Sequence, residues 1–352
     1  MAVLEKFPVI DVTGSPEEIG TQHGKLLKNR INQTIEFYSD VTKKLDEEGR
    51  ERNRKYILNS ARNFKKIIHA YNSEYSVEIE AIAEAADVDP LWIYAINSRS
   101  EIMSNMENGT TECTALYFKN PRVLGQNWDW AADFEELAFV MRLTKPDGHK
   151  IIQVTEPGMI GKIGFNNSGL GVCLNFLRIE EELDGLPIHI ILRALLDSKS
   201  IEEAKDLAKN VGKGQSGNIL MGDKNGKYQD IEFGGNEVYI LDSENNHFIH
   251  TNHFLMNEKL NSKPELLLSS FNRYEIASIL AKNHQTPSLE LMKSILLDDS
   301  DPELPICRKY IPGTRMEKVG TVCTILMDLN QEVMHITKGS PLHNPFTKIS
   351  LN

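Results

Sequence analysis

The sequence changes character at Cys113, and this change constrains the fold more than any other feature. Upstream, the chain is polar and its apolar residues recur at helical spacing. Downstream, short apolar runs alternate with turn residues, a pattern typical of strands. The polar segment Asn108-Gly-Thr-Thr-Glu112 opens with a turn dipeptide, so we expect an exposed loop there. The mostly apolar residues that follow predict a strand at about 113–119, with the thiol at its first residue.

A cysteine at the start of a strand, behind a loop that can be cut, is placed to become an N-terminus. A thiol is mostly protonated at neutral pH and needs a base. Cleavage of Glu112–Cys113 would release an α-amine on the cysteine itself, with an ordinary pKa of about 7.7–8.0, so one residue would supply nucleophile and base. The thiol could make this cut by attacking the preceding carbonyl and forming a thioester that water releases. Taken alone, Cys113 could also be a buried structural thiol.

The flanking motifs resemble those of N-terminal-nucleophile amide hydrolases. Cys113-Thr114, followed by Gly125-Gln-Asn-Trp-Asp129, is most similar to the acyl-CoA:6-aminopenicillanate acyltransferase family and less so to the penicillin V acylase and bile salt hydrolase family. Five other motifs continue the resemblance in order: Gly14-Ser-Pro-Glu-Glu-Ile-Gly20, Asn97-Ser-Arg-Ser-Glu-Ile102, Thr251-Asn-His-Phe254, Ser270-Phe-Asn-Arg273 and Gly320-Thr-Val-Cys-Thr-Ile325. The resemblance implies an α+β fold of four layers, αββα, with two stacked antiparallel sheets. It also implies a zymogen whose helical segment 1–112 stays associated with the catalytic core 113–352 after autocatalytic cleavage.

Helix and strand patterns favour the same architecture. Ser15 and Glu18 form a capping box around Pro16, and we expect this helix to continue to about Lys44. Its expected buried face consists of Ile19, Leu26, Leu27, Ile31 and Ile35. Further helices are expected at 50–72, 74–87, 90–105, 187–197, 201–210 (with a second capping box, Ser200 and Glu203), 264–282 and 288–296. Strands are expected at 8–13, 113–119, 122–127, 137–144, 150–155, 160–165, 169–175, 218–222, 227–233, 237–241, 247–251, 320–328 and 332–338.

Three further residues are candidates for the catalytic machinery. The resemblance implies that the Asp129 carboxylate holds the α-ammonium of Cys113, although an aspartate in this position also fits a turn. Asn252 follows an apolar strand and could donate its amide to an oxyanion, or close an Asx-turn. Arg273 lies in an otherwise apolar stretch and could reach the active-site carboxylate or a substrate carboxylate. A solvated helix face is the alternative for Arg273.

Four polar residues are candidates for substrate binding: Gln126, Asn127, Ser216 and Asn218. At Gln126 the sequence departs from the bile salt hydrolases, which carry an arginine there, so the thiolate would receive less electrostatic help from this position. Ser216 and Asn218 begin a strand, where a turn or capping role is an equal alternative. We expect no metal site at His247, His250 and His253, because residues three apart on a strand point to opposite faces. Cys173, Cys307 and Cys323 are expected to be structural.

Composition narrows the remaining choices. The 352 residues are 40% hydrophobic and 25% charged, with a formal net charge of −11 and no long run of like charge. These values disfavour nucleic acid and anionic membranes as partners. No apolar run approaches the roughly 20 residues that span a bilayer, and the N-terminus has no uninterrupted apolar core of signal-peptide length. Four widely spaced cysteines are typical of free thiols in the cytoplasm.

The sequence therefore predicts a cytoplasmic, self-cleaving enzyme that hydrolyses a small N-acyl amide through a thioester on Cys113, without a cofactor. The expected partners are a small-molecule amide or thioester substrate and the two fragments with each other; assembly into a homo-oligomer is left open. An acyltransferase that moves an acyl group from a thioester donor to an amine is one alternative. An uncleaved, non-catalytic binding protein is another, and a papain-like hydrolase with a histidine base is a third.

Overall fold

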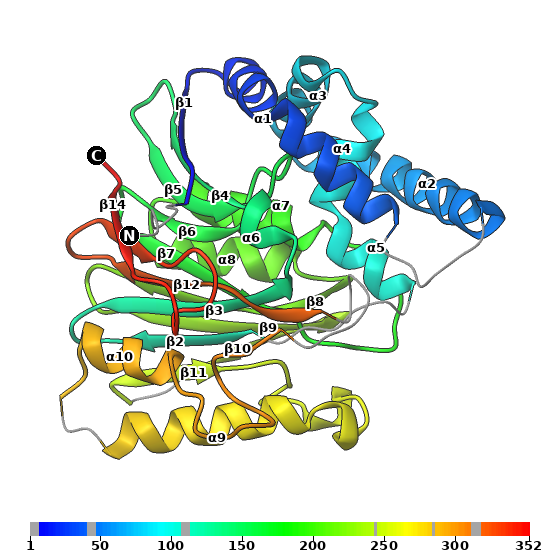
Figure 1. The fold of residues 1–352 in the computed structure, drawn as a ribbon. Helices are drawn as coiled ribbons and strands as arrows, with labels where there is room; N and C mark the ends of the chain where they lie inside the picture. The colour runs from blue at the N-terminus through cyan, green and yellow to red at the C-terminus, as the bar shows by residue number, and fades with distance from the viewer. Residues whose placement is uncertain (1–6, 41–46, 107–112, 243–244, 284–285, 311–317) are drawn as a thin grey trace.

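The computed structural model describes residues 7–40, 47–106, 113–242, 245–283, 286–310 and 318–352. Within these ranges the strands form two sheets at the centre of the molecule (Figure 1). Sheet A has, in spatial order, β1 (Val9–Thr13), β4 (Phe139–Thr144), β5 (Lys150–Thr155), β6 (Ile163–Asn166), β7 (Leu170–Asn175), β8 (Gln215–Asp223), β9 (Tyr228–Gly235) and β10 (Glu237–Leu241). Sheet B has β11 (His247–His250), β2 (Thr114–Phe118), β3 (Val123–Ala131), β12 (Val319–Asp328), β13 (Val333–Ile336) and β14 (Thr347–Ser350).

The two sheets are stacked and covered by helices on their outer faces. Strands β2 and β3 of sheet B pack against β7 and β8 of sheet A. Helices α7 (Ile188–Asp197) and α8 (Ile201–Val211) cover sheet A, and α9 (Leu268–Asn283) and α10 (Leu289–Leu296) cover sheet B (Figure 1). Strand β1 runs parallel to β4, and the other neighbouring strands are antiparallel. The expected four-layer α+β fold is thereby confirmed.

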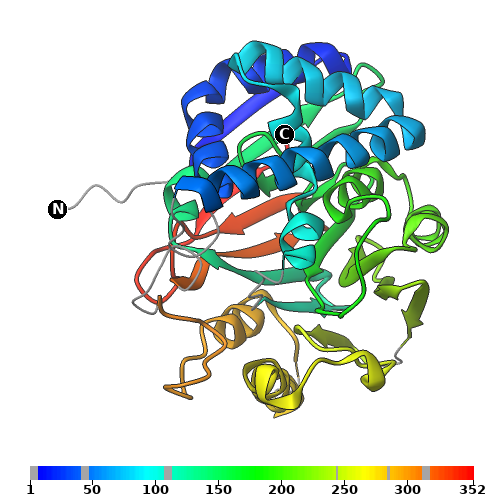
Figure 2. The same ribbon diagram turned by 90° about the vertical axis from the view of Figure 1, so that its right-hand side faces the viewer.

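The N-terminal helices form a separate group at one end of the sandwich (Figure 2). They are α1 (Pro16–Ser39), α2 (Glu47–Tyr71), α3 (Ser73–Ala86), α4 (Pro90–Asn97) and α5 (Arg99–Asn105). Helices α1 and α3 approach closely because α1 carries Gly20 and Gly24 at the contact. A Cβ atom at Gly20 would lie 2.3 Å from the Glu78 carbonyl oxygen, and one at Gly24 would lie 2.4 Å from the Ile82 carbonyl oxygen. The segment is not purely helical, since its β1 is an edge strand of sheet A.

Two helix predictions need correction in the N-terminal segment. The capping box of Ser15 and Glu18 is present, but α1 ends at Ser39 rather than near Lys44. Leu26 is 59% exposed and does not belong to the buried face, because the helix departs from helical geometry at its neighbour Leu27.

The single helix expected at 90–105 is two helices, α4 and α5, separated at Ser98. Ser98 has non-helical dihedral angles, and the Asn97 amide donates both to the Ile93 carbonyl and to the Gly158 carbonyl of another segment. Polar side chains that bond the backbone in this way compete with helix continuation.

Smaller differences occur later in the chain. Ser200 caps α8, but the Glu203 carboxylate accepts from the backbone of Lys199 instead of Ser200. Helix α6 (Phe134–Leu137) and strand β14 were not predicted, and short 3-10 turns η1 (Glu258–Leu260) and η2 (Pro264–Leu266) precede α9. Strand β3 is longer than predicted and extends through Asp129 to Ala131. This extension places the predicted catalytic carboxylate inside sheet B rather than in a loop.

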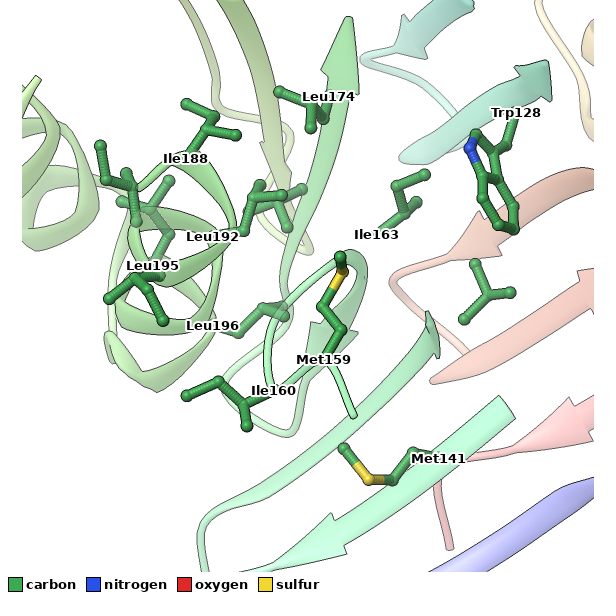
Figure 3. Close-up of a cluster of buried hydrophobic side chains, with 14 of the residues drawn as sticks. Trp128, Met141, Met159, Ile160, Ile163, Leu174, Ile188, Leu192, Leu195 and Leu196 are labelled. Atoms are coloured by element: carbon green, nitrogen blue, oxygen red, sulfur yellow. The ribbon is translucent and has the colours of Figure 1, made fainter. Parts of the chain in front are cut away.

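The main hydrophobic core fills the space between the sheets and extends under α7. Figure 3 labels members from α7 (Ile188, Leu192, Leu195, Leu196), from sheet A and its loops (Met141, Met159, Ile160, Ile163, Leu174) and from β3 (Trp128). A second core lies between sheet B and helices α9 and α10. No helix among the described residues is long and apolar enough to cross a membrane.

Candidate active site

Cys113 is the residue directly before β2, which pairs with β3. Thr114 pairs with Asn127, so Cys113 stands beside the next two residues of β3, Trp128 and Asp129. Its side chain is 8% exposed and lines a cavity between the two sheets. The predicted strand start at the thiol is therefore present. Glu112, the other half of the expected cleavage site, lies outside the described residues.

Arg273 of α9 connects the start of β2 to Asn252. Its guanidinium donates from Nη1 to the Cys113 carbonyl oxygen at 2.6 Å and from Nη2 to the Asn252 Oδ1 at 2.9 Å. Nη1 also donates to the Thr114 hydroxyl at 2.8 Å. Arg273 is fully buried, so the alternative of a solvated helix face is wrong. A rigid planar fork suits this position because one side chain fixes two partners at once.

Asn252 is held on both sides of its amide. Its Nδ2 donates to the Phe176 carbonyl at 3.0 Å, while Oδ1 accepts from Arg273. Its backbone amide donates to the Ser270 hydroxyl at 2.7 Å. The side chain therefore has a defined orientation and is linked to the Cys113 carbonyl through Arg273, although Asn252 is not among the residues that line the cavity. Nδ2 carries a second hydrogen.

Asp129 contributes both its backbone and its charge to the environment of the thiol. Burial and, after it, the Asp129 carboxylate raise the pKa of the Cys113 thiol, which is about 11 once all its neighbours are included. A hydrogen bond from the Asp129 backbone amide opposes this increase, as do the positive charges of Arg273 and Lys162. In the uncut chain the thiol is therefore protonated at neutral pH and requires a base to react.

The cavity in front of the thiol is mostly apolar with a few polar groups. Its volume is about 50 Å³, several times the 10–15 Å³ needed by one water molecule. It is lined by Arg99, Ser100, Met103, Ser104, Cys113, Trp128, Asp129, Trp130, Lys162, Ile163, Leu174 and Phe176. Helix α5 thus forms one wall, sheet B another and sheet A a third. Mostly apolar cavities with few convergent polar groups are typical of small-molecule sites.

A buried charge cluster lies at the wall formed by α5 and sheet A. The Glu156 carboxylate accepts from Arg99 Nη2 at 2.7 Å, from Lys162 Nζ at 2.5 Å and from the Tyr38 hydroxyl at 2.6 Å. Burial raises the pKa of Glu156, but the two cations outweigh burial and hold that pKa well below its usual range. The carboxylate is therefore ionised at neutral pH.

The four predicted substrate-binding residues do not line this cavity. The Gln126 amide exchanges two hydrogen bonds with the backbone of Leu174, which ties β3 to β7. The Asn127 amide donates to backbone carbonyls of α10 and the following loop. Ser216 donates to the Leu177 carbonyl, and Asn218 donates to the Asp230 carboxylate. All four side chains are fully buried, and that of Gln126 connects the two sheets.

The three histidines considered for metal binding have separate partners. His250 is fully buried, with Nε2 2.8 Å from the Glu232 carboxylate, and His253 Nδ1 lies 2.8 Å from the Ser270 hydroxyl. His247 packs edge-on against Phe118. None of the three lines the cavity at Cys113. Cys173, Cys307 and Cys323 are buried free thiols.

Sequence reasoning missed the wall of the cavity. The motif Asn97–Ile102 was recognised, but no role was given to its Arg99 or Ser100. Lys162 was also overlooked, although a single lysine between the apolar residues Ile160 and Ile163 is a signal that could have found it. A buried lysine requires a partner, and buried charged groups of this kind are often functional.

Comparisons with known proteins identify the family of the chain. The family model for "Acyl-coenzyme A:6-aminopenicillanic acid acyl-transferase" matches residues 118–343. The chain belongs to this family. It is 28% identical over 347 residues to the 40 kDa form of acyl-coenzyme A:6-aminopenicillanic-acid-acyltransferase from Emericella nidulans, covering 94% of this chain and 92% of that protein. The expected family and the expectation of an enzyme are confirmed.

Solved structures give weaker similarities. A mutant conjugated bile acid hydrolase from Clostridium perfringens aligns with a TM-score of 0.46 and 15% identity, over 68% of this chain and 92% of that chain. A penicillin V acylase from Agrobacterium tumefaciens aligns with a TM-score of 0.37 and 12% identity, over 69% and 80% of the two chains. At these scores neither similarity bears on the chemistry of this chain.

Proposed function

We propose that this family member cleaves itself between Glu112 and Cys113 and then cleaves a small N-acyl amide through a thioester on Cys113. The observation that carries the proposal is the pair of hydrogen bonds that Arg273 donates to Cys113 and Asn252. This one guanidinium fixes the carbonyl of Cys113 and the amide of Asn252, so nucleophile and oxyanion donor are oriented by the same group. Such fixed placement of reacting groups is a major source of catalytic rate.

The proposed reaction needs no group beyond those in the site. The α-amine of Cys113, held by Asp129, takes the thiol proton as the sulfur attacks the amide carbonyl carbon. Asn252 Nδ2 donates to the oxyanion that forms. The α-ammonium then gives its proton to the leaving nitrogen, the C–N bond breaks, and the acyl group stays on sulfur. Attack by water restores the thiol and releases the acid.

Self-cleavage follows from the same requirement for a base. Among the described residues that line the cavity there is no histidine, and burial keeps the thiol protonated in the uncut chain. Release of an α-amine with an ordinary pKa of about 7.7–8.0 would place a base on the same residue. The family match supports this proposal only indirectly, since it begins at residue 118 and does not include Cys113.

Acyl transfer is the second candidate, and the name of the matching family favours it. In this reaction an acyl-CoA-like thioester donates the acyl group to Cys113, and an amine replaces water in the second step. Product analysis with a thioester donor, with and without an added amine, tests it. An amide product that forms faster than the free acid supports transfer, whereas free acid as the sole product excludes it for that amine.

Intact mass tests the proposal against an uncleaved binding protein. Self-cleavage predicts two species, residues 1–112 and residues 113–352, whereas a silent binding protein predicts one species of 39.8 kDa. The cleaved protein should then be assayed against a panel of amides and thioesters. An intact chain that binds these compounds without turnover would contradict the proposed function. The panel also defines the acyl and amine groups that the site accepts.

A further inference from the structure

Lys162 is a buried cation on the wall of the cavity into which the thiol opens. It lies directly before β6, and its side chain is 2% exposed. Its ammonium stands 3.8 Å from the centroid of the Trp128 ring, and Trp128 is the residue of β3 beside Cys113. A desolvated ammonium over an indole face is stabilised by the negative potential of the ring. Trp128 therefore holds this cation next to the start of β2.

The partners of Lys162 leave positive charge in excess at this wall. Among the described residues, Lys162 and Arg99 both form their ion pairs with a single carboxylate, Glu156. Arg99 is further stacked on Trp130, with its guanidinium 4.4 Å from the ring centroid. A buried charge is costly unless it is paired. The other carboxylate that lines the cavity, Asp129, lies on β3 beside Cys113, so Lys162 and Arg99 are the positive side of the cavity that faces the nucleophile.

Residue 126 of β3, where the bile salt hydrolases carry an arginine, supplies no cation in this chain. Gln126 is neutral, and both ends of its amide are bonded to the backbone of Leu174. Its side chain is fully buried in the contact between the sheets. Positive charge for a thiolate on this side of Cys113 must therefore come from another element, and Lys162 reaches the cavity from sheet A.

We propose that Lys162, positioned by Glu156 and Trp128, is the cation that stabilises the thiolate of Cys113. The inference deepens the proposed function, on which it rests, by assigning a charge-stabilising residue from sheet A to a nucleophile on sheet B. When the thiol proton moves to the α-amine, the negative charge formed on sulfur faces the Lys162 ammonium. No bond to Lys162 forms or breaks. Burial lowers the pKa of Lys162 to about 8, so the ammonium keeps its proton at neutral pH.

Several other charged or titratable groups lie near the Cys113 thiol, and the experiment must separate their effects from that of Lys162. The charged or titratable neighbours of Cys113 are Asp129 on β3, Arg273 on α9, Cys173 on β7 and Cys323 on β12. Those of Lys162 are Glu156, Arg99 on α5 and Cys113. His189 on α7 also faces the charge cluster, but burial lowers its pKa well below the ordinary value, so it is neutral at pH 7. Arg273 donates to Ser269, Cys113, Thr114 and Asn252 and is not among the residues that line the cavity, whereas Lys162 lines it.

The test is the pH dependence of Cys113 alkylation by iodoacetamide, a neutral reagent, followed by mass spectrometry of the peptide that contains Cys113. At pH 7, where Lys162 is charged, Lys162→Met should lower the rate of alkylation about tenfold, the loss of thiolate that a rise of about one in its apparent pKa produces. Lys162→Arg keeps the charge and should give a profile close to wild type. Lys145→Met is the matched control, because Lys145 also pairs with one carboxylate, Asp197 at 2.7 Å, but does not line the cavity.

Steady-state kinetics give a second test of Lys162 and distinguish a failure of this inference from a failure of the proposed function. With a neutral amide substrate, Lys162→Met should lower kcat about tenfold with little change in KM. Superimposed alkylation profiles for Lys162→Met and wild type would overturn the inference, as would an equal shift in Lys162→Arg. A rise in KM confined to carboxylate-bearing substrates, with unchanged alkylation, would also overturn it and assign Lys162 to substrate binding. If wild type is never cleaved and never turns over, the proposed function fails, while the alkylation profiles still decide the role of Lys162.

Discussion

Replacement of Asn252 by alanine tests the oxyanion assignment most directly. One amide hydrogen of the side chain is engaged by Phe176, and its oxygen accepts from Arg273, which also bonds to the Cys113 carbonyl. Nδ2 therefore keeps one hydrogen for an oxyanion, in an orientation fixed before substrate arrives. Loss of a preorganised donor of this kind costs about 2.7–4 kcal/mol of transition-state stabilisation. We expect kcat of Asn252→Ala to fall about 10²–10³-fold, with a small change in KM.

The same substitution has a structural cost that the sequence did not reveal. Removal of the amide leaves the Phe176 carbonyl and one Arg273 donor buried without their partner. An orphaned buried group costs about 1–3 kcal/mol, so we expect Asn252→Ala to unfold about 2–4 kcal/mol more easily in urea. Activity must therefore be measured under conditions in which the variant is folded, as judged by its unfolding curve.

Asn252→Asp separates the two effects. The carboxylate keeps an acceptor for Arg273 but has no amide hydrogen for an oxyanion. We expect this variant to be more stable than Asn252→Ala and equally inactive. Folded Asn252→Ala with a kcat within threefold of wild type would refute the oxyanion role and leave Asn252 as a structural link between Arg273 and Phe176.

Three further predictions follow from the site. On a denaturing gel the protein should run as two pieces, the larger beginning at Cys113, and Cys113→Ala should remain one chain; a different N-terminus would contradict cleavage at Glu112–Cys113. In the processed enzyme, Asp129→Asn should lower kcat strongly with little change in melting temperature, because the α-ammonium loses its charged partner; near-normal turnover would exclude that role. Glu156→Gln should lower the unfolding free energy at pH 7 by about 3–5 kcal/mol, because two buried cations lose their carboxylate. Since the pKa of Glu156 is held below its usual range, this stabilisation is complete above about pH 4.5 and declines in acid, so wild type and variant should converge in urea titrations at low pH.

Candidate site residues that are marked by a pattern within one stretch of sequence could be predicted from the sequence. The loop-to-strand change placed Cys113, and the polar residue after an apolar strand identified Asn252. Arg273 was identified as a charge in an apolar helix, and burial of that charge is what the structure adds. The outer architecture was also predictable, because periodicity of 2 and of 3.6 depends on neighbours in sequence.

The residues that fill the cavity could not be predicted in the same way. Gln126 and Asn127 lie in the catalytic motif, but strand alternation turns one toward Leu174 and the other toward α10. Which face of β3 meets the cavity depends on the stacking of the sheets, which no local pattern contains. The wall from α5 depends on the break at Ser98, where a helix was expected to continue.

The contacts across the expected cut determine what cleavage would do to the molecule. Two ion pairs connect the piece 1–112 to the piece 113–352. Arg99 of the first piece bonds to Glu156 of the second, and Glu78 of the first bonds through both carboxylate oxygens to Arg193 of the second. These four side chains are buried, so separating the pieces would expose or orphan two ion pairs, each costing about 3–5 kcal/mol when one partner is lost. Strand β1 adds backbone pairing with β4. We therefore expect the two pieces to co-elute at neutral pH after cleavage, because the first piece supplies both a sheet edge and the counter-charges of the second.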